Sequence, residues 1–100
     1  MSLDVAIRTR LEQTRGEVPV SDLFAHLDRD AVFIVGTTVS LVECGVSVAM
    51  DDVDKVRVLV EAGDLRKPTL GERDHWRATP THRVVSIVVQ PFVLVQTLPD

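Results

Sequence analysis

The sequence predicts a small α/β (α+β) domain in which three to five helices pack on a small mixed sheet. The strongest evidence is the stretch from Val84 to Gln96, where nine apolar and mostly β-branched residues surround the dipeptide Gln90-Pro91. β-branched side chains suit a pleated, buried surface, so this stretch is typical of sheet core. Helical spacing and capping residues recur between earlier strand-like runs. With a length of 100 residues, we expect residues 1–100 to form a single domain.

Local patterns predict each element in chain order. Leu3, Ile7 and Leu11 recur every four residues and predict a first helix, which Ser2 caps and Gly16 ends. Residues 17–20 are extended, because Pro19 restricts its neighbour. The remaining predicted elements are helices over 22–27 (capped by Ser21), 39–50, 53–62 and 70–78, and strands near 31–35, 64–67, 83–89 and 92–97.

The segment Val39–Met50 is ambiguous. Its β-branched residues favour a strand, but on a helical wheel only Glu43 and Ser47 interrupt the apolar surface. These two residues are four apart and form one polar stripe, which indicates a nearly buried helix.

Capping residues mark the helices that follow. Asp51-Asp52 precede the helix over 53–62, whose apolar face carries Val56, Leu59 and Val60, and Gly63 follows it at the expected C-terminal position. Thr69 and Glu72 have the spacing of a capping box and predict the start of the helix over 70–78.

Pro91 decides how the last two strands are expected to connect. A two-residue hairpin favours residues with positive φ, and Gln-Pro does not supply them, so one long bent strand is predicted. We expect this strand to pair with 31–35 and to bury Val88, Val93, Leu94 and Val95.

Composition favours a cytoplasmic protein without a membrane segment. Cys44 is the single cysteine, so no internal disulfide forms, and the N-terminus lacks a signal-peptide pattern. The net charge of −4 disfavours non-specific attraction to nucleic acid or to anionic lipid. The Lys-free run from Val84 to Leu98 predicts a sheet edge that a homodimer would cover.

The carboxylates Glu43, Asp51, Asp52 and Asp54 form the one acidic cluster in the sequence. Glu43 and Asp51 are eight apart, so one helix can bring them to one face, and paired carboxylates can hold Mg²⁺ or Ca²⁺. Asp51-Asp52 also suits helix capping, and we favour this interpretation over ligand binding. The sequence therefore assigns no metal and no cofactor, and keeps Glu43, Asp51 and Asp52 as candidate ligand-binding residues.

His75 and Trp76 are the other candidate ligand-binding residues. With Arg73 and Arg77 they can make a small surface for an anion or an aromatic ligand, aided by a cation–π contact. The alternative is that Trp76 anchors its helix on the sheet. The histidines lack metal-ligand spacing, and the serines and glycines match no nucleophile or phosphate-loop motif, so no catalytic residue is assigned.

Two segments offer a nucleic-acid alternative. Residues 18–27 are similar to the first half of a helix-turn-helix, but a strand-like run follows where a recognition helix belongs. The helix over 53–62 with residues 63–67 can instead form a recognition helix and wing. It offers only Lys55 and Arg57 against Asp54 and Glu61, so this class ranks third.

Three motifs resemble a family of short bacterial hypothetical proteins, the domain-of-unknown-function family number 2288. They are residues 40–43 running to Asp51-Asp52, then 62–65, and finally the segment Val88-Val89-Gln90-Pro91-Phe92-Val93-Leu94-Val95-Gln96. The likeness covers roughly residues 11–96, and its last motif is the most specific. The chain departs from the family pattern at Ser40, where the family has an acid, and at Phe92, where it has another aromatic. The resemblance implies a fold and a bacterial origin, and it assigns no activity.

These observations favour a non-enzymatic interaction or regulatory domain that self-associates, with a protein partner that the sequence does not name. The alternative is a weak metal-dependent or ligand-dependent activity at Glu43, Asp51 and Asp52. A winged-helix nucleic-acid binder is the third class.

Overall fold

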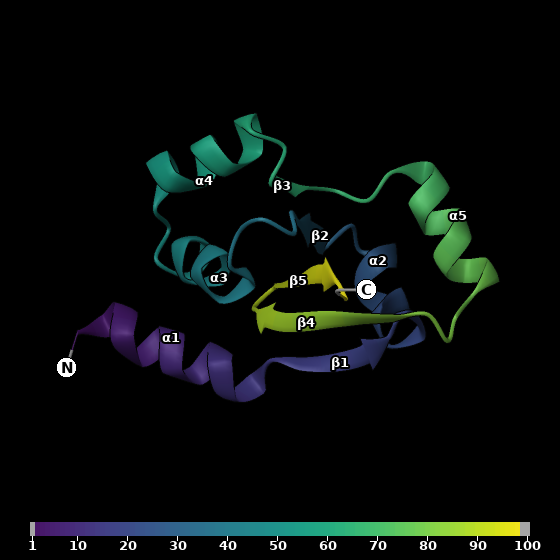
Figure 1. The fold of residues 1–100 in the computed structure, drawn as a ribbon, viewed down its shortest axis with the longest axis horizontal. Helices are drawn as coiled ribbons and strands as arrows, with labels where there is room; N and C mark the ends of the chain where they lie inside the picture. Colours follow the sequence, from purple (N-terminus) through teal and green to yellow (C-terminus); the bar gives the residue numbers. More distant parts are fainter. Residues whose placement is uncertain (1, 99–100) are drawn as a thin grey trace.

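The computed structural model describes residues 2–98, which form a five-stranded mixed sheet with helices on both faces (Figure 1). The strand order is β1-β4-β5-β2-β3, with β2 and β5 parallel and the other neighbours antiparallel. The elements in chain order are α1 (Leu3–Thr14), β1 (Gly16–Pro19), the 3₁₀-helix η1 (Val20–Leu23), α2 (Phe24–Asp28), β2 (Val32–Val35), α3 (Leu41–Ala49), α4 (Val53–Glu61), β3 (Leu65–Arg66), α5 (Leu70–Ala78), β4 (Arg83–Val89) and β5 (Phe92–Thr97). The predicted α+β class and its four strands are confirmed.

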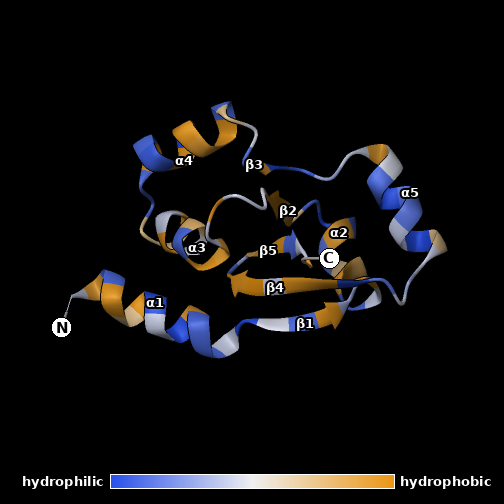
Figure 2. Ribbon diagram, in the orientation of Figure 1, coloured by the Kyte–Doolittle hydropathy of each residue, from blue (hydrophilic) through white to orange (hydrophobic). Residues whose placement is uncertain are grey.

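The two faces of the sheet carry two separate cores because successive strand residues point to opposite sides. On β5, Leu94 packs into the core beneath α1 and α3, whereas Val93 and Val95 pack against η1, α2 and α5. All three are almost fully buried, as the sequence predicts. Figure 2 shows β4 as a largely apolar ribbon and α5 as a mostly polar helix, whereas α3 and α4 carry apolar stretches.

The ambiguous segment is the helix α3. The Ser40 side chain caps it by accepting from the Glu43 N–H, and the polar stripe of Glu43 and Ser47 lies outside the core. Gly45 is buried where α3 crosses the sheet, and an added Cβ would lie 2.5 Å from Ile87 Cδ1 and 2.9 Å from Leu11 Cδ1. Glycine therefore allows α1 and α3 to pack closely over β4.

The prediction of one long bent strand at Pro91 is wrong. β4 and β5 pair antiparallel up to Val89 and Phe92, and the intervening Gln90–Pro91 peptide bond is cis. A cis-proline at the third position makes a type VI turn, a tight turn that does not need the positive φ of the usual hairpins.

The prediction that Val88 is buried is also wrong, since its relative exposure is 46%. Val88 alternates with Ile87 and Val89, so it points to the face that α2 and α5 cover. Those helices lie at the opposite end of β4 from the hairpin (Figure 1), and Val88, beside the hairpin, stays exposed.

Two predicted caps are corrected. Ser2 occupies the N-cap position of α1 without a side-chain capping hydrogen bond. Ser21 lies inside η1 and does not precede a helix, because Val20 N–H and Ser21 N–H bond to the carbonyls of His82 and Pro80 and hold this segment as a 3₁₀ turn.

The C-terminal strands do not form a sheet edge. β4 and β5 lie between β1 and β2, so the edges of the described sheet are the short strands β1 and β3. The edge argument for a homodimer therefore fails, since short edge strands are themselves a protection against pairing.

Candidate functional site

The helix α4 is packed more loosely than α3, although both are nine residues long. Among the described residues, α3 buries five of its own, whereas α4 buries none. α4 nevertheless carries five apolar side chains, namely Val53, Val56, Val58, Leu59 and Val60. Hollows lie on both sides of α4, and its exposed apolar side chains line them.

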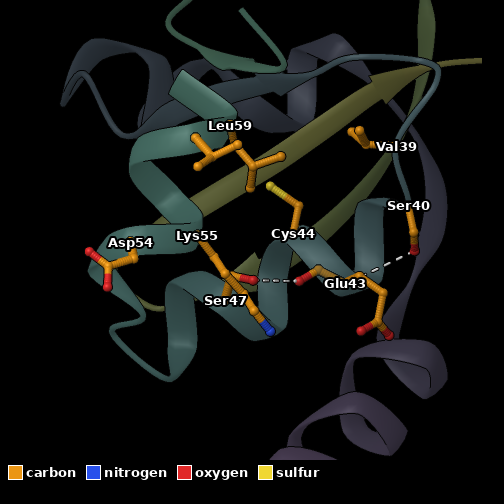
Figure 3. Close-up of a pocket in the computed structure, with 9 residues that line it drawn as sticks. Val39, Ser40, Glu43, Cys44, Ser47, Asp54, Lys55 and Leu59 are labelled. Carbon is orange, nitrogen blue, oxygen red and sulfur yellow. Dashed lines mark hydrogen bonds between the residues drawn. The ribbon is translucent and has the colours of Figure 1, made fainter. Parts of the chain in front are cut away.

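One hollow, the α3–α4 pocket, lies between the two helices and has a volume of about 400 Å³ (Figure 3). Its walls are apolar, with Cys44 aimed toward Leu59, and polar side chains from both helices stand at the mouth. The lining residues are Val39, Ser40, Glu43, Cys44, Ser47, Asp54, Lys55, Val58 and Leu59.

Cys44 is not equipped for nucleophilic chemistry in this pocket. Burial, with a smaller contribution from the charge of Asp64, raises the pKa of the thiol from 9.0 to about 11. The thiolate is the reactive form of cysteine, so Cys44 stays protonated near neutral pH.

A second hollow, the α4 groove, runs along the other side of the helix. Two adjoining cavities share the lining residues Val48, Val56, Val60 and Phe92, so they form one continuous groove. Phe92 and Phe33 make an edge-to-face contact in its floor, with ring centroids 5.4 Å apart. Exposed Val53 and Val60, at 55% and 54% relative exposure, extend this apolar surface into solvent.

Charged residues lie at the two ends of the α4 groove. Asp51 lines the end at the start of α4, and Arg66 and Lys67 line the end beyond its last turn. Arg66 is hydrogen-bonded to Glu72, and Lys67 to Asp30. Arg57 and Glu61 line the groove together with Asp51, and the charges of Arg66 and Lys67 are offset by their carboxylate partners, so charges of both signs border the groove.

The three predicted carboxylates take different roles in the fold. Glu43 accepts two hydrogen bonds from Arg8 of α1, and its carboxylate points toward α1 and away from the α3–α4 pocket (Figure 3). Asp52 caps α4 by accepting from the Lys55 N–H at 3.3 Å, as the sequence predicts. Asp51 has a positive φ of 54° in the turn between the helices. Within residues 2–98 no group of three or more His, Cys, Asp or Glu side chains is arranged to hold a metal ion.

His75 and Trp76 point to different environments. Trp76 is 6% exposed and packs in the core with Val84 and Val93, which matches its role as a helix anchor. His75 is exposed and lies edge-to-face with His82. The cation–π contact of this helix involves Arg77 and the ring of Phe24, 5.2 Å from its centroid, and not Trp76.

The basic residues of the last third of the chain do not form a free cationic face. Each is in an ion pair with a carboxylate that lies elsewhere in the fold. The pairs are Arg66–Glu72, Lys67–Asp30, Arg73–Asp30, Arg77–Asp28 and Arg83–Glu17.

Sequence reasoning placed Val56, Leu59 and Val60 on the inner face of α4 but missed the groove. A signal was present, because Val53 and Val58 are apolar and lie off that face. The contributions of Phe33, Val48 and Phe92 come from other elements, and the spacing within α4 does not report them.

The fold and these hollows define an α+β domain with an exposed apolar surface along α4. Residues 6–97 match the family described as "Protein of unknown function (DUF2288)", and the chain belongs to that family. A solved structure, titled "NMR solution structure of PA1075 from Pseudomonas Aeruginosa", is similar at a TM-score of 0.78 and 23% identity. The match covers 100% of this chain and 89% of that chain, and it shows a shared fold. None of the curated proteins matches the chain.

Membrane insertion through a helix is not supported by the described part of the chain. None of the helices formed by residues 2–98 has the length and apolar character that a membrane span requires.

Proposed function

We propose that this protein is a non-enzymatic interaction domain of the cytoplasm that self-associates, and that α4 carries its binding surface. The observation that carries the proposal is that three of the five apolar residues of α4, Val53, Val58 and Val60, stay more than half exposed, while Val56 and Leu59 pack only partly against the core. A contiguous apolar surface bordered by charges is characteristic of interaction sites in proteins.

Energetics support this interpretation. Removing apolar surface from water contributes about 25 cal/mol per Å² of favourable free energy. The exposed valines of α4 do not make this contribution in the folded chain. A partner seated on the helix would recover it. The alternative site at Glu43, Asp51 and Asp52 has no such support, because Glu43 is paired with Arg8 and Asp52 caps a helix.

The cytoplasmic assignment rests on Cys44. The thiol is buried, and its raised pKa keeps it protonated, which is compatible with a reducing compartment and offers no route to a disulfide.

Thermal unfolding over a range of protein concentrations tests the proposal. A self-associating domain gains stability by mass action, so its Tm rises with concentration. Sedimentation velocity at the same concentrations reports the species present, and a strict monomer at high micromolar concentration would overturn self-association.

A ligand panel tests the enzyme alternative in parallel. We expect Mg²⁺, Ca²⁺, nucleotides and inorganic phosphate to leave the Tm unchanged at fixed protein concentration. A cation-induced rise that disappears in Asp51→Asn/Asp52→Asn would favour the carboxylate alternative over the proposed function.

A further inference from the structure

We propose that a pocket beside α1 binds a small amphipathic carboxylate, an aliphatic chain that ends in one carboxylate group. This α1 pocket has a volume of about 470 Å³, and the residues that line it lie on α1, at the end of α3 and in the β4–β5 hairpin. The site is therefore separate from the surface along α4 and goes beyond the proposed function. Small-ligand sites typically have volumes of about 300–1,000 Å³, with apolar walls and a few polar groups.

The α1 pocket forms at a place where the sheet is incompletely covered. β1 pairs with β4 only from Arg83 to Ser86, so the last residues of β4 extend past the start of β1 toward the hairpin. The last turns of α1 lie beside this part of β4 in place of a strand. Ala49, at the end of α3, contributes only a methyl group to the space between them, so the pocket stays unfilled.

The walls of the α1 pocket are apolar. Ile7 and Leu11 are four residues apart and share one face of α1. Leu11 and Val89 are buried and belong to the core beneath α1 and α3, whereas Val88 lines the pocket as an exposed side chain. Such walls favour an aliphatic chain, because its binding removes apolar surface of both partners from water.

Arg10 gives the α1 pocket a charge of one sign. It lies three residues from Ile7 and four from Thr14 on the same face of α1, and it is the one charged residue among the described residues that line the pocket. Within residues 2–98 the Arg10 side chain forms no ion pair, whereas Arg8, two positions earlier, is bound to Glu43. The Arg10 guanidinium can therefore donate to a ligand without breaking a pair in this part of the chain.

A carboxylate matches the donors of Arg10. A guanidinium presents its N–H groups in a planar fork that binds both oxygens of a carboxylate. The exposed Thr14 and Gln90 add polar groups to the same lining. The other hollows do not favour an anion in this way, because charges of both signs line the α3–α4 pocket and border the α4 groove.

Octanoate is the probe that tests the chemistry of the ligand. Octanol has the same chain without the charge, and acetate has the charge without the chain. NMR chemical-shift titration below micellar concentrations should show octanoate binding, octanol binding about tenfold more weakly, as loss of a charge-assisted hydrogen bond predicts, and no binding of acetate in the same range. An absence of octanoate binding, or equal affinities for octanoate and octanol, would overturn the inference.

The role of Arg10 is tested with a matched pair of variants. Arg10→Gln and Arg15→Gln remove the same charge from exposed residues, one within α1 and one at its C-cap, but only Arg10 lines the pocket. Arg10→Gln should weaken octanoate binding about tenfold and leave octanol binding unchanged, and Arg15→Gln should change neither. Equal losses in the two variants would show a general effect of net charge and would contradict the proposed site.

Ala49→Leu tests the pocket itself. Ala49 is exposed, and leucine is a good helix former, so the substitution fills the space while the Tm without ligand stays close to that of the parent. Both octanoate and octanol should bind more weakly to this variant, in contrast to Arg10→Gln, which affects octanoate alone. Parental affinity of Ala49→Leu for octanoate would place the ligand elsewhere and overturn the inference.

Discussion

Arg8 of α1 and Glu43 of α3 are 35 residues apart in the sequence and joined by two hydrogen bonds, one of them Nη2 to Oε1 at 2.9 Å. The guanidinium thus binds the carboxylate through both oxygens, a geometry that gives strong and directional pairing. It ties the N-terminal helix to the helix that forms one wall of the α3–α4 pocket.

The Arg8–Glu43 pair makes the first prediction. Its hydrogen bonds from Arg8 lower the pKa of Glu43, so the pair stabilises the fold above the ordinary glutamate pKa and is lost as pH falls through the lowered value. Arg8→Gln and Glu43→Gln should each lower the Tm at pH 7, and their effects should not add in the double variant. Thermal unfolding of the four proteins measures this. Additive losses would show that the pair is not coupled.

The second prediction concerns Glu72, which closes the capping box with Thr69 and binds Arg66. Its hydrogen bond from Arg66 is the main cause that lowers its pKa from 4.5 to about 2. The folded state therefore gains stability from this carboxylate above pH 4.5 and loses it as pH falls from 4.5 toward 2.

Glu72→Gln isolates this acid dependence. Glutamine can keep the capping hydrogen bond but carries no charge for Arg66. Urea unfolding of parent and variant between pH 7 and pH 3 should show the variant less stable at neutral pH, with the two converging in acid. A constant difference across that range would contradict the linkage.

The third prediction contrasts two residues of the C-terminal hairpin. Leu94 is 1% exposed and Val88 is 46% exposed. Leu94→Ala removes buried methyl groups and leaves a cavity, so it should cost about 2–4 kcal/mol in the free energy of unfolding. Val88→Ala should cost less than about 1 kcal/mol, since much of that side chain already contacts water. Denaturant midpoints of the two variants decide the matter, and similar losses would contradict the assigned cores.

The fourth prediction concerns Asp52 as the N-cap of α4. Asp52→Ala removes the acceptor for the Lys55 N–H and should cost about 0.5–2 kcal/mol in the free energy of unfolding. Asp52→Asn should be nearly neutral, because asparagine caps about as well and loses only the smaller dipole contribution. Chemical denaturation compares them, and an Asn variant as unstable as the Ala variant would show that the charge matters more than the cap.

Local chemistry explains why so many elements could be predicted from the sequence. The capping box at Thr69 and Glu72, the Asp52 cap and the Gly63 terminus at φ 77° are interactions between residues a few positions apart. The polar stripe of Glu43 and Ser47 likewise follows from helical spacing within one segment. Neighbours in the chain decide these features, so the sequence reveals them directly.

Long-range packing decided the features that prediction missed. Val88 belongs to an apolar run, but its exposure depends on how far α2 and α5 extend across the sheet. The turn at Pro91 depends on a peptide-bond isomer, and the internal position of β4 and β5 depends on which strands flank them.

The candidate site also has one part that the sequence reveals and another that only the tertiary structure reveals. α4 contains apolar residues outside its predicted buried face, Val53 and Val58, and the sequence alone shows them. The groove itself exists because Phe33, Val48 and Phe92, from three other elements, converge beside α4. Spacing within a segment specifies which side chains share a face, because helical and strand periods are local. Only the packing of distant elements settles which of those faces are covered, because that depends on contacts between residues far apart in the chain.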